Sequence, residues 1–162
     1  MPNLCRHRLM LLALLLAVLP LQAQPAPAAT AAATGQPAVY APRTGDEWID
    51  RALAGINDYA ARYPDSLVDE VSRYLDVARD YAQALLKQPG WHAGDLYFAC
   101  ALAKATGKPC REVVRAWSRD RAGGWRGVAK TFDAQPGSAE YGKIRETLRA
   151  SHAHWARPLP IR

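Results

Sequence analysis

The spacing of apolar residues is the feature that most constrains this chain. From Thr44 onwards they recur at steps of three and four, the spacing that lines one face of an α-helix. No long stretch alternates apolar and polar residues with the period of two that a half-buried strand requires. The pattern predicts helices over about 44–63, 66–86, 95–106, 109–121 and 125–132, with a last helix after Ser138. We therefore expect an all-α fold, a compact bundle of five to six short helices.

Capping residues and helix breakers predict where these helices begin and end. Thr44 and Glu47 have the Thr-x-x-Glu spacing of a capping box at the start of the first helix. Pro64 is expected to end that helix, and Ser66 is the predicted cap of the second. Ser138 follows a Pro-Gly turn and is the predicted cap of the last helix.

The first 23 of the 162 residues have the layout of a secretory signal peptide. Arg6 and Arg8 form a short basic start, an apolar stretch follows from Leu9 to Leu21, and Ala23 stands two residues after it. As a helix that stretch spans about 20 Å, well short of the roughly 30 Å hydrocarbon core, which disfavours the alternative of an uncleaved anchor. We expect cleavage after Ala23 and a periplasmic or secreted protein.

Residues 24–43 contain eight Ala, four Pro and no acidic residue, a composition that predicts a flexible linker. Proline favours extended backbone, and alanine buries too little surface to offset the ordering entropy. Residues 44–155 form the expected helical domain, and 156–162 a C-terminal tail. This length suits one domain and excludes a multidomain protein, a coiled-coil rod and a polytopic membrane protein.

Charge divides the domain into two unlike halves. Residues 46–95 carry a net charge of −5 and residues 96–162 a net charge of +8. The positive charge concentrates on and after the fourth predicted helix, interleaved with two tryptophans, at Lys108, Arg111, Arg115, Arg119, Arg126, Trp117 and Trp125. Such a face suits an anionic envelope component or an acidic protein surface, with the indoles taking part if they are exposed. The alternative is a solvated face partly neutralised by the acidic half.

Cys100 and Cys110 are the two cysteines that remain after leader removal. They flank a Thr-Gly-Lys-Pro turn, and an oxidising compartment permits a disulfide between them. Two reduced, buried thiols are the alternative. No second Cys pair or nearby His pair completes a metal site, and no cofactor motif is present in the sequence.

No catalytic signature is present in the sequence, which favours a binding protein over an enzyme. An exported helical protein rich in aromatic residues raises the alternative of peptidoglycan cleavage, in which a carboxylic acid protonates the leaving oxygen. Glu70 and Glu112 are the candidates for that acid, although first-turn carboxylates are also stabilised by the helix dipole. His152 and His154, two residues apart, are expected in a frayed C-terminus.

Residues 117–148 contain a short helix, a turn and a second helix, in the order of a helix-turn-helix. The basic fourth helix adds to this similarity. Because an exported protein does not meet chromosomal DNA, nucleic-acid binding is the alternative only for a chain that stays in the cytoplasm with its leader.

The same region resembles a family of small, uncharacterised, exported bacterial helical proteins. Their signature is Gly-Trp-Gly-x-x-Ala-Lys-x-Leu-Gly-x-x-Pro-Gly-Ser followed by an aromatic residue, and the likeness covers about residues 95–145. Here Arg126, Phe132 and Asp133 depart from the second Gly, the Leu and the later Gly. The resemblance implies export, an all-helical fold and the cysteine pair, with Trp125 as a core anchor and Ser138 as a cap. It implies no activity.

Overall fold

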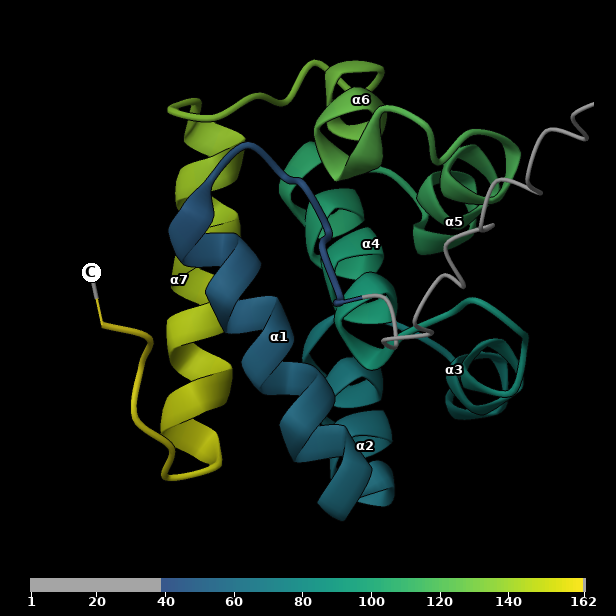
Figure 1. Cartoon of the computed structure of the whole chain (residues 1–162). Coiled ribbons are helices and arrows are strands. Elements are labelled where there is room, and N and C mark those ends of the chain that lie inside the picture. Colours follow the sequence, from purple (N-terminus) through teal and green to yellow (C-terminus); the bar gives the residue numbers. More distant parts are fainter. Residues whose placement is uncertain (1–38, 162) are drawn as a thin grey trace, which may run out of the picture. The chain divides into compact units, whose positions relative to one another are not determined.

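The structure is a computed structural model and describes residues 39–161 (Figure 1). The predicted signal peptide and residues 24–38 of the predicted linker lie outside the described residues. Between residues 39 and 161 the chain forms helices and no strand, which confirms the all-α prediction. Seven helices are present where five to six were expected: α1 (Glu47–Arg62), α2 (Pro64–Tyr74), α3 (Arg79–Leu86), α4 (Ala93–Thr106), α5 (Cys110–Arg119), α6 (Gly124–Lys130) and α7 (Ala139–His154).

Helix α4 is the centre of the bundle. It packs against α1, α2, α3, α5 and α7, and all but two of its residues are buried. The exceptions are Lys104 and Thr106 near its C-terminal end. A helix that is apolar all round requires neighbours on every side. Helices α1 and α7 lie side by side along it (Figure 1), and the pockets described below lie at the two ends of this pair.

The cap of α1 is Asp46, not Thr44 as predicted. The Asp46 carboxylate accepts hydrogen bonds from the backbone N–H groups of Trp48 and Ile49, both at 3.1 Å. The Thr44 hydroxyl instead donates to the carboxylate of Asp50 at 2.6 Å. A carboxylate two residues further along therefore satisfies the free N–H groups of the first turn, and the predicted capping box does not form.

The second predicted helix is divided into α2 and α3. Asp76 takes a left-handed backbone conformation with φ of 55°, which interrupts the helix, while its neighbours Leu75 and Val77 are both buried. Leu75 and Val77 are two residues apart, which places them on opposite sides of a continuous helix, so burying both against one core favours a break between them. Helix α2 begins at Pro64, two residues before the predicted cap Ser66. Proline is tolerated at the first helical position because the backbone N–H that it lacks would have no partner within the helix there.

Residues at the end of the predicted linker pack on the helical domain. The backbone N–H of Trp125 donates to the carbonyl of Pro42, and that of Arg126 donates to the carbonyl of Arg43, both at 2.9 Å. The Tyr40 hydroxyl donates to buried Asp95 on α4 at 3.2 Å. Burial raises the pKa of Tyr40 well above its usual range, and the negative charge of Asp95 adds to this effect. The ordered domain thus includes residues 40–43.

Cys100 and Cys110 form the predicted disulfide, with their Cα atoms 4.6 Å apart. It links α4 to the first residue of α5 across a turn in which Gly107 takes φ of 68°. A left-handed residue at this position commonly ends a helix, and glycine adopts it without steric cost. The predicted cap of the last helix is also confirmed, because the Ser138 hydroxyl accepts from the Tyr141 N–H.

Candidate functional site

Three of the predicted basic residues share the exposed side of α5. Arg111, Arg115 and Arg119 are four residues apart along the helix, all exposed, and none forms an ion pair with another described residue. The guanidinium of Arg111 lies 4.8 Å from the ring centre of Tyr81 on α3. Burial raises the pKa of Tyr81, and these nearby arginine charges reduce the effect. We call these three residues the α5 arginine row.

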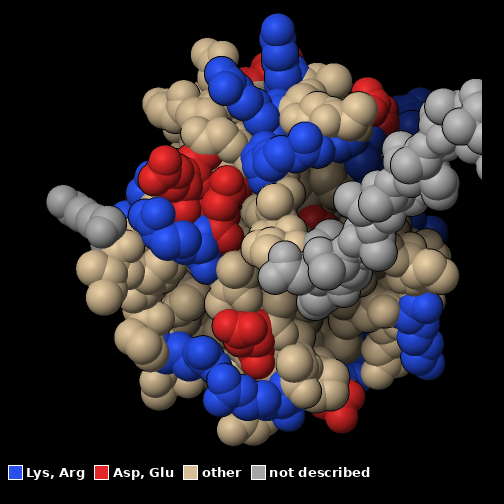
Figure 2. Space-filling model, in the orientation of Figure 1, with Lys and Arg blue, Asp and Glu red and all other residues tan. Residues whose placement is uncertain are grey.

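The other two predicted cations lie elsewhere. Lys108 lines a hollow whose lining also includes three acidic residues, Glu112, Asp133 and Glu140. Arg126 lies on α6, where its side chain packs beside Gly45. On the face shown in Figure 2, Lys and Arg side chains form separate groups with acidic side chains among them. Lys108 and Arg126 thus have different surroundings from the α5 arginine row.

Trp117 and Trp125 are core residues, so the exposure on which their part in a binding face depended is absent, and Trp125 is buried as the family resemblance implies. Their rings stack on each other with centroids 4.1 Å apart and an interplanar angle of 11°. The Trp125 Nε1–H donates to the buried carboxylate of Asp95 at 2.7 Å. Both indoles are buried where α6, which carries Trp125, packs against α5, which carries Trp117. Neither ring is available to a partner.

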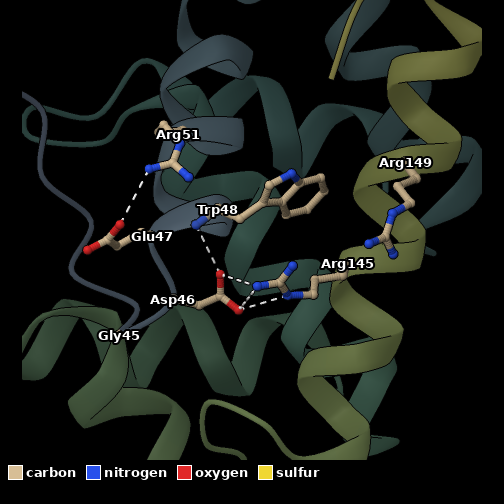
Figure 3. Close-up of a pocket in the computed structure, with 7 residues that line it drawn as sticks. All are labelled: Gly45, Asp46, Glu47, Trp48, Arg51, Arg145 and Arg149. Atoms are coloured by element: carbon tan, nitrogen blue, oxygen red, sulfur yellow. Dashed lines mark hydrogen bonds and ion pairs between the residues drawn. The ribbon is translucent and has the colours of Figure 1, made fainter. Parts of the chain in front are cut away.

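A hollow that the sequence did not predict lies between the start of α1 and α7. Its volume is about 510 Å³. We call it the Arg–Trp pocket (Figure 3), and it is lined by Gly45, Asp46, Glu47, Trp48, Arg51, Arg145 and Arg149. A volume of this size falls within the roughly 300–1,000 Å³ of small-molecule sites.

Asp46 and Arg145 form the fixed wall of the Arg–Trp pocket. Arg145 Nε donates to Asp46 Oδ2 and Nη2 donates to Oδ1, each at 2.8 Å. This two-point geometry is the strong form of an arginine–carboxylate pair. The same carboxylate caps α1, so one residue holds the helix start and orients the arginine across from it.

Two guanidinium groups lie against Trp48. Those of Arg145 and Arg149 are each 5.1 Å from its ring centre, which is cation–π distance. Arg149 forms no ion pair with another described residue. Arg51 pairs only with exposed Glu47, at 3.5 Å, an interaction of little strength in water. The lining thus holds three arginines against two carboxylates, and Arg149 has its full set of donors open to a ligand.

The arrangement of this pocket suits an anion. A guanidinium presents paired N–H donors that match the oxygens of a carboxylate or phosphate group. Sequence reasoning missed the site because it followed the charge on the fourth predicted helix. The one signal was the four-residue spacing of Arg145 and Arg149, and nothing in the sequence placed Trp48 beside them.

The two candidate acids lie on different helices and line different hollows. Glu70 on α2 is buried, and its Oε1 accepts from the Ser151 hydroxyl at 2.6 Å and lies 2.9 Å from His154 Nδ1. Glu112 is half-buried on α5 in the hollow that contains Lys108. The hydrogen bond from Ser151 and the contact with His154 both involve Oε1, so this oxygen is committed to groups within the protein.

His152 and His154 belong to the last turn of α7 rather than to a frayed end. His152 is buried, with Nδ1 at 3.0 Å from the Pro158 carbonyl, whereas His154 faces Glu70. Burial holds the pKa of His152 below its usual value, and the charge of Arg157 acts in the same direction. Among the residues that the structure describes, no group of three or more His, Cys, Asp or Glu side chains is placed to hold a metal ion.

Helices α6 and α7 do not pack together as the helix-turn-helix alternative requires. α6 packs on α5, whereas α7 packs on α4 and α1. In a DNA-binding helix-turn-helix the two helices pack against each other and present the second to the major groove.

No helix between residues 39 and 161 combines the length and the apolar character needed to cross a bilayer. Comparisons with known protein families, curated proteins and solved structures gave no match for this chain.

Proposed function

We propose that this protein is a non-enzymatic binding module that recognises an anionic partner outside the cytoplasm. The observation that carries the proposal is the pair of guanidiniums on Trp48, of which Arg149 has no acidic partner among the described residues. Stacking on an indole restricts the arginine side chain, so less freedom is lost when a ligand binds. A phosphate or carboxylate group that enters the Arg–Trp pocket can accept hydrogen bonds from the whole guanidinium of Arg149 and from Nη1 of Arg145.

The α5 arginine row supports the proposal in a second way. Exposed cations without internal partners attract anions over about a Debye length, roughly 8–10 Å at physiological salt. Their contribution is to the rate of association with an extended anionic surface, while a concave pocket supplies close contacts. The partner class is therefore an anionic envelope component or an acidic protein face, as the sequence predicts.

Export is part of this proposal. It is supported by the signal-peptide layout of residues 1–23 and by the disulfide, since disulfides persist in oxidising compartments. The intact mass of the protein from an envelope fraction tests it. A chain that starts at Gln24 and is about 2 Da lighter than its reduced form supports export. A full-length, reduced, cytosolic chain contradicts it.

Binding to phosphatidylglycerol vesicles and to inorganic pyrophosphate tests the proposed site. We expect Arg149→Ala to weaken binding of both probes by about tenfold, the effect of one lost charge-assisted hydrogen-bonding group. Arg62→Ala is the matched control, because Arg62 is exposed on α1, lies outside the pocket and carries the same charge. Affinity should fall steeply as salt is added.

The outcomes separate the two surfaces. Loss of binding in Arg115→Ala with no change in Arg149→Ala moves the site from the pocket to the α5 arginine row. Equal effects of Arg149→Ala and Arg62→Ala would show that binding depends only on the net charge of the protein, and would contradict the pocket as the binding site. Binding to vesicles but not pyrophosphate identifies a lipid surface as the source of the phosphate groups. Salt-insensitive binding contradicts both surfaces.

A further inference from the structure

A second hollow lies at the opposite end of the α1–α7 pair, against α2. Its volume is about 310 Å³. We call it the aromatic pocket, and it is lined by Tyr59, Ser66, Asp69, Glu70, Arg73, Tyr74, His154 and Trp155. It shares no residue with the Arg–Trp pocket, so what it binds is independent of the proposed function.

Glu70 provides a fixed acceptor in this pocket. It is only 6% exposed, and its Oε1 already holds Ser151 and His154. Ser151 in turn lies 2.6 Å from the buried Tyr97 hydroxyl, so the carboxylate is held by a chain of hydrogen bonds that reaches into the core. Oε2 has no hydrogen-bond partner among the described residues, and Glu70 is one of the residues that line the hollow. One oxygen is thus committed to structure and the other is open to a ligand.

Two stacked aromatic pairs border the same hollow. Tyr74 stacks on His154 with ring centres 4.4 Å apart, and Tyr59 stacks on Trp155 at 4.2 Å. Each pair fixes its rings before any ligand arrives, which lowers the entropy lost on binding. Tyr74 is 40% exposed and presents an aromatic surface at the solvent edge of the pocket. Large aromatic surface kept partly in water is typical of a recognition site.

The charges of the lining favour a neutral ligand. Asp69 is paired with Arg79 and Glu70 lies against His154, while Arg73 also lines the hollow. Arg73 disfavours an ammonium ligand, and Glu70 disfavours an anion. Together with the Ser66 hydroxyl they offer both donors and acceptors, as a ligand rich in hydroxyl groups requires.

From this geometry we infer that the aromatic pocket binds a saccharide unit. A pyranose ring has an apolar C–H face, which packs on Tyr74, and hydroxyl groups at its edge. One hydroxyl donates to Glu70 Oε2, and another accepts from Arg73. Cleavage is not part of the inference, since glycoside hydrolysis uses two carboxyl groups and the second one here, Asp69, is held by Arg79.

Titration with the soluble trisaccharide of N-acetylglucosamine, followed by amide chemical shifts of the mature protein, tests this inference. We expect shifts at residues around the pocket that saturate at millimolar concentration. Tyr74→Ala should weaken binding about fivefold to tenfold, the size of an aromatic stacking contribution. Glu70→Gln should weaken it at least about tenfold, as expected for a hydrogen bond to a charged group.

Two control variants make the result specific. Tyr63→Ala removes a tyrosine that is 52% exposed but does not line the pocket, and it should bind the trisaccharide as the unaltered protein does. Arg149→Ala should also bind it normally, so failure of the proposed anion site and failure of this site are distinguishable. Because Tyr74 lies at the surface, Tyr74→Ala remains decisive if Glu70→Gln does not fold.

Three results would overturn the inference. One is the absence of shifts at millimolar trisaccharide. Another is an equal loss in Tyr74→Ala and Tyr63→Ala. The third is a response of the same signals to tetramethylammonium but not to the trisaccharide, which would make the pocket a cation site.

Discussion

The Asp46 carboxylate has two roles, helix capping and ion pairing, and two different substitutions at this position separate their contributions to stability. Its carboxylate caps α1 and also takes two hydrogen bonds from Arg145. Asp46→Ala removes both roles. Asp46→Asn keeps the cap, because Asn and Asp cap helices equally well, and removes only the charge.

The magnitudes follow from the geometry and the burial of the pair. Losing the cap costs about 1 kcal/mol of unfolding free energy. The pair is intermediate between buried and exposed, since the Asp46 side chain is 8% exposed and that of Arg145 35%. We therefore assign the ion pair a contribution of about 1–2 kcal/mol to the unfolding free energy, between the values typical of surface pairs and of buried pairs. Asp46→Ala should therefore lose about 2–3 kcal/mol and Asp46→Asn about 1–2 kcal/mol.

Urea unfolding followed by circular dichroism measures these free energies. A double-mutant cycle of Asp46→Asn with Arg145→Met isolates the pair and should give a coupling of about 1–2 kcal/mol. Equal losses in Asp46→Ala and Asp46→Asn would show that the cap contributes nothing. A coupling below about 0.3 kcal/mol would refute the assignment of the pair as the fixed wall of the pocket.

Three further predictions concern the core and the C-terminal end. Reduction of the Cys100–Cys110 disulfide, which closes a loop with a sequence separation of 10, should lower the unfolding free energy by about 2–3 kcal/mol, measured in urea with and without reductant. Trp125→Phe should cost about 2–4 kcal/mol in the same assay, because it removes ring contacts and leaves buried Asp95 without its indole donor. The pKa of His152 is lower in the folded protein than in the unfolded chain, so on acidification the unfolded chain binds the proton first. The contribution of neutral His152 to the unfolding free energy is therefore complete above the ordinary histidine pKa of 6.5. It is lost as the pH falls from there towards the pKa of His152 in the folded protein. The difference in stability between the protein and His152→Gln, measured from about pH 5 to pH 8, should shrink on acidification, and a constant difference would contradict this.

Local patterns in the sequence were sufficient for the helices and several of their ends. The Gly107 turn, the Ser138 cap and the disulfide depend on residues close together in the chain, where spacing and residue type carry the information. The cap of α1 and the break at Asp76 were not predicted correctly. In each, a competing interaction decided the outcome: Thr44 bonds to Asp50, and both Leu75 and Val77 turn inward.

The sequence by itself determined an all-helical chain with an excess of positive charge in its second half. Tertiary packing decided which of the charged and aromatic side chains lie next to one another. Trp117 and Trp125 resemble the tryptophans of a binding face in the sequence, yet they stack inside the core because α6 folds back on α5. Trp48 and Arg149 are about a hundred residues apart and meet only because α1 and α7 both pack on α4. Periodicity encodes which side of a helix is buried, but contacts between distant helices depend on how all the buried sides fit together.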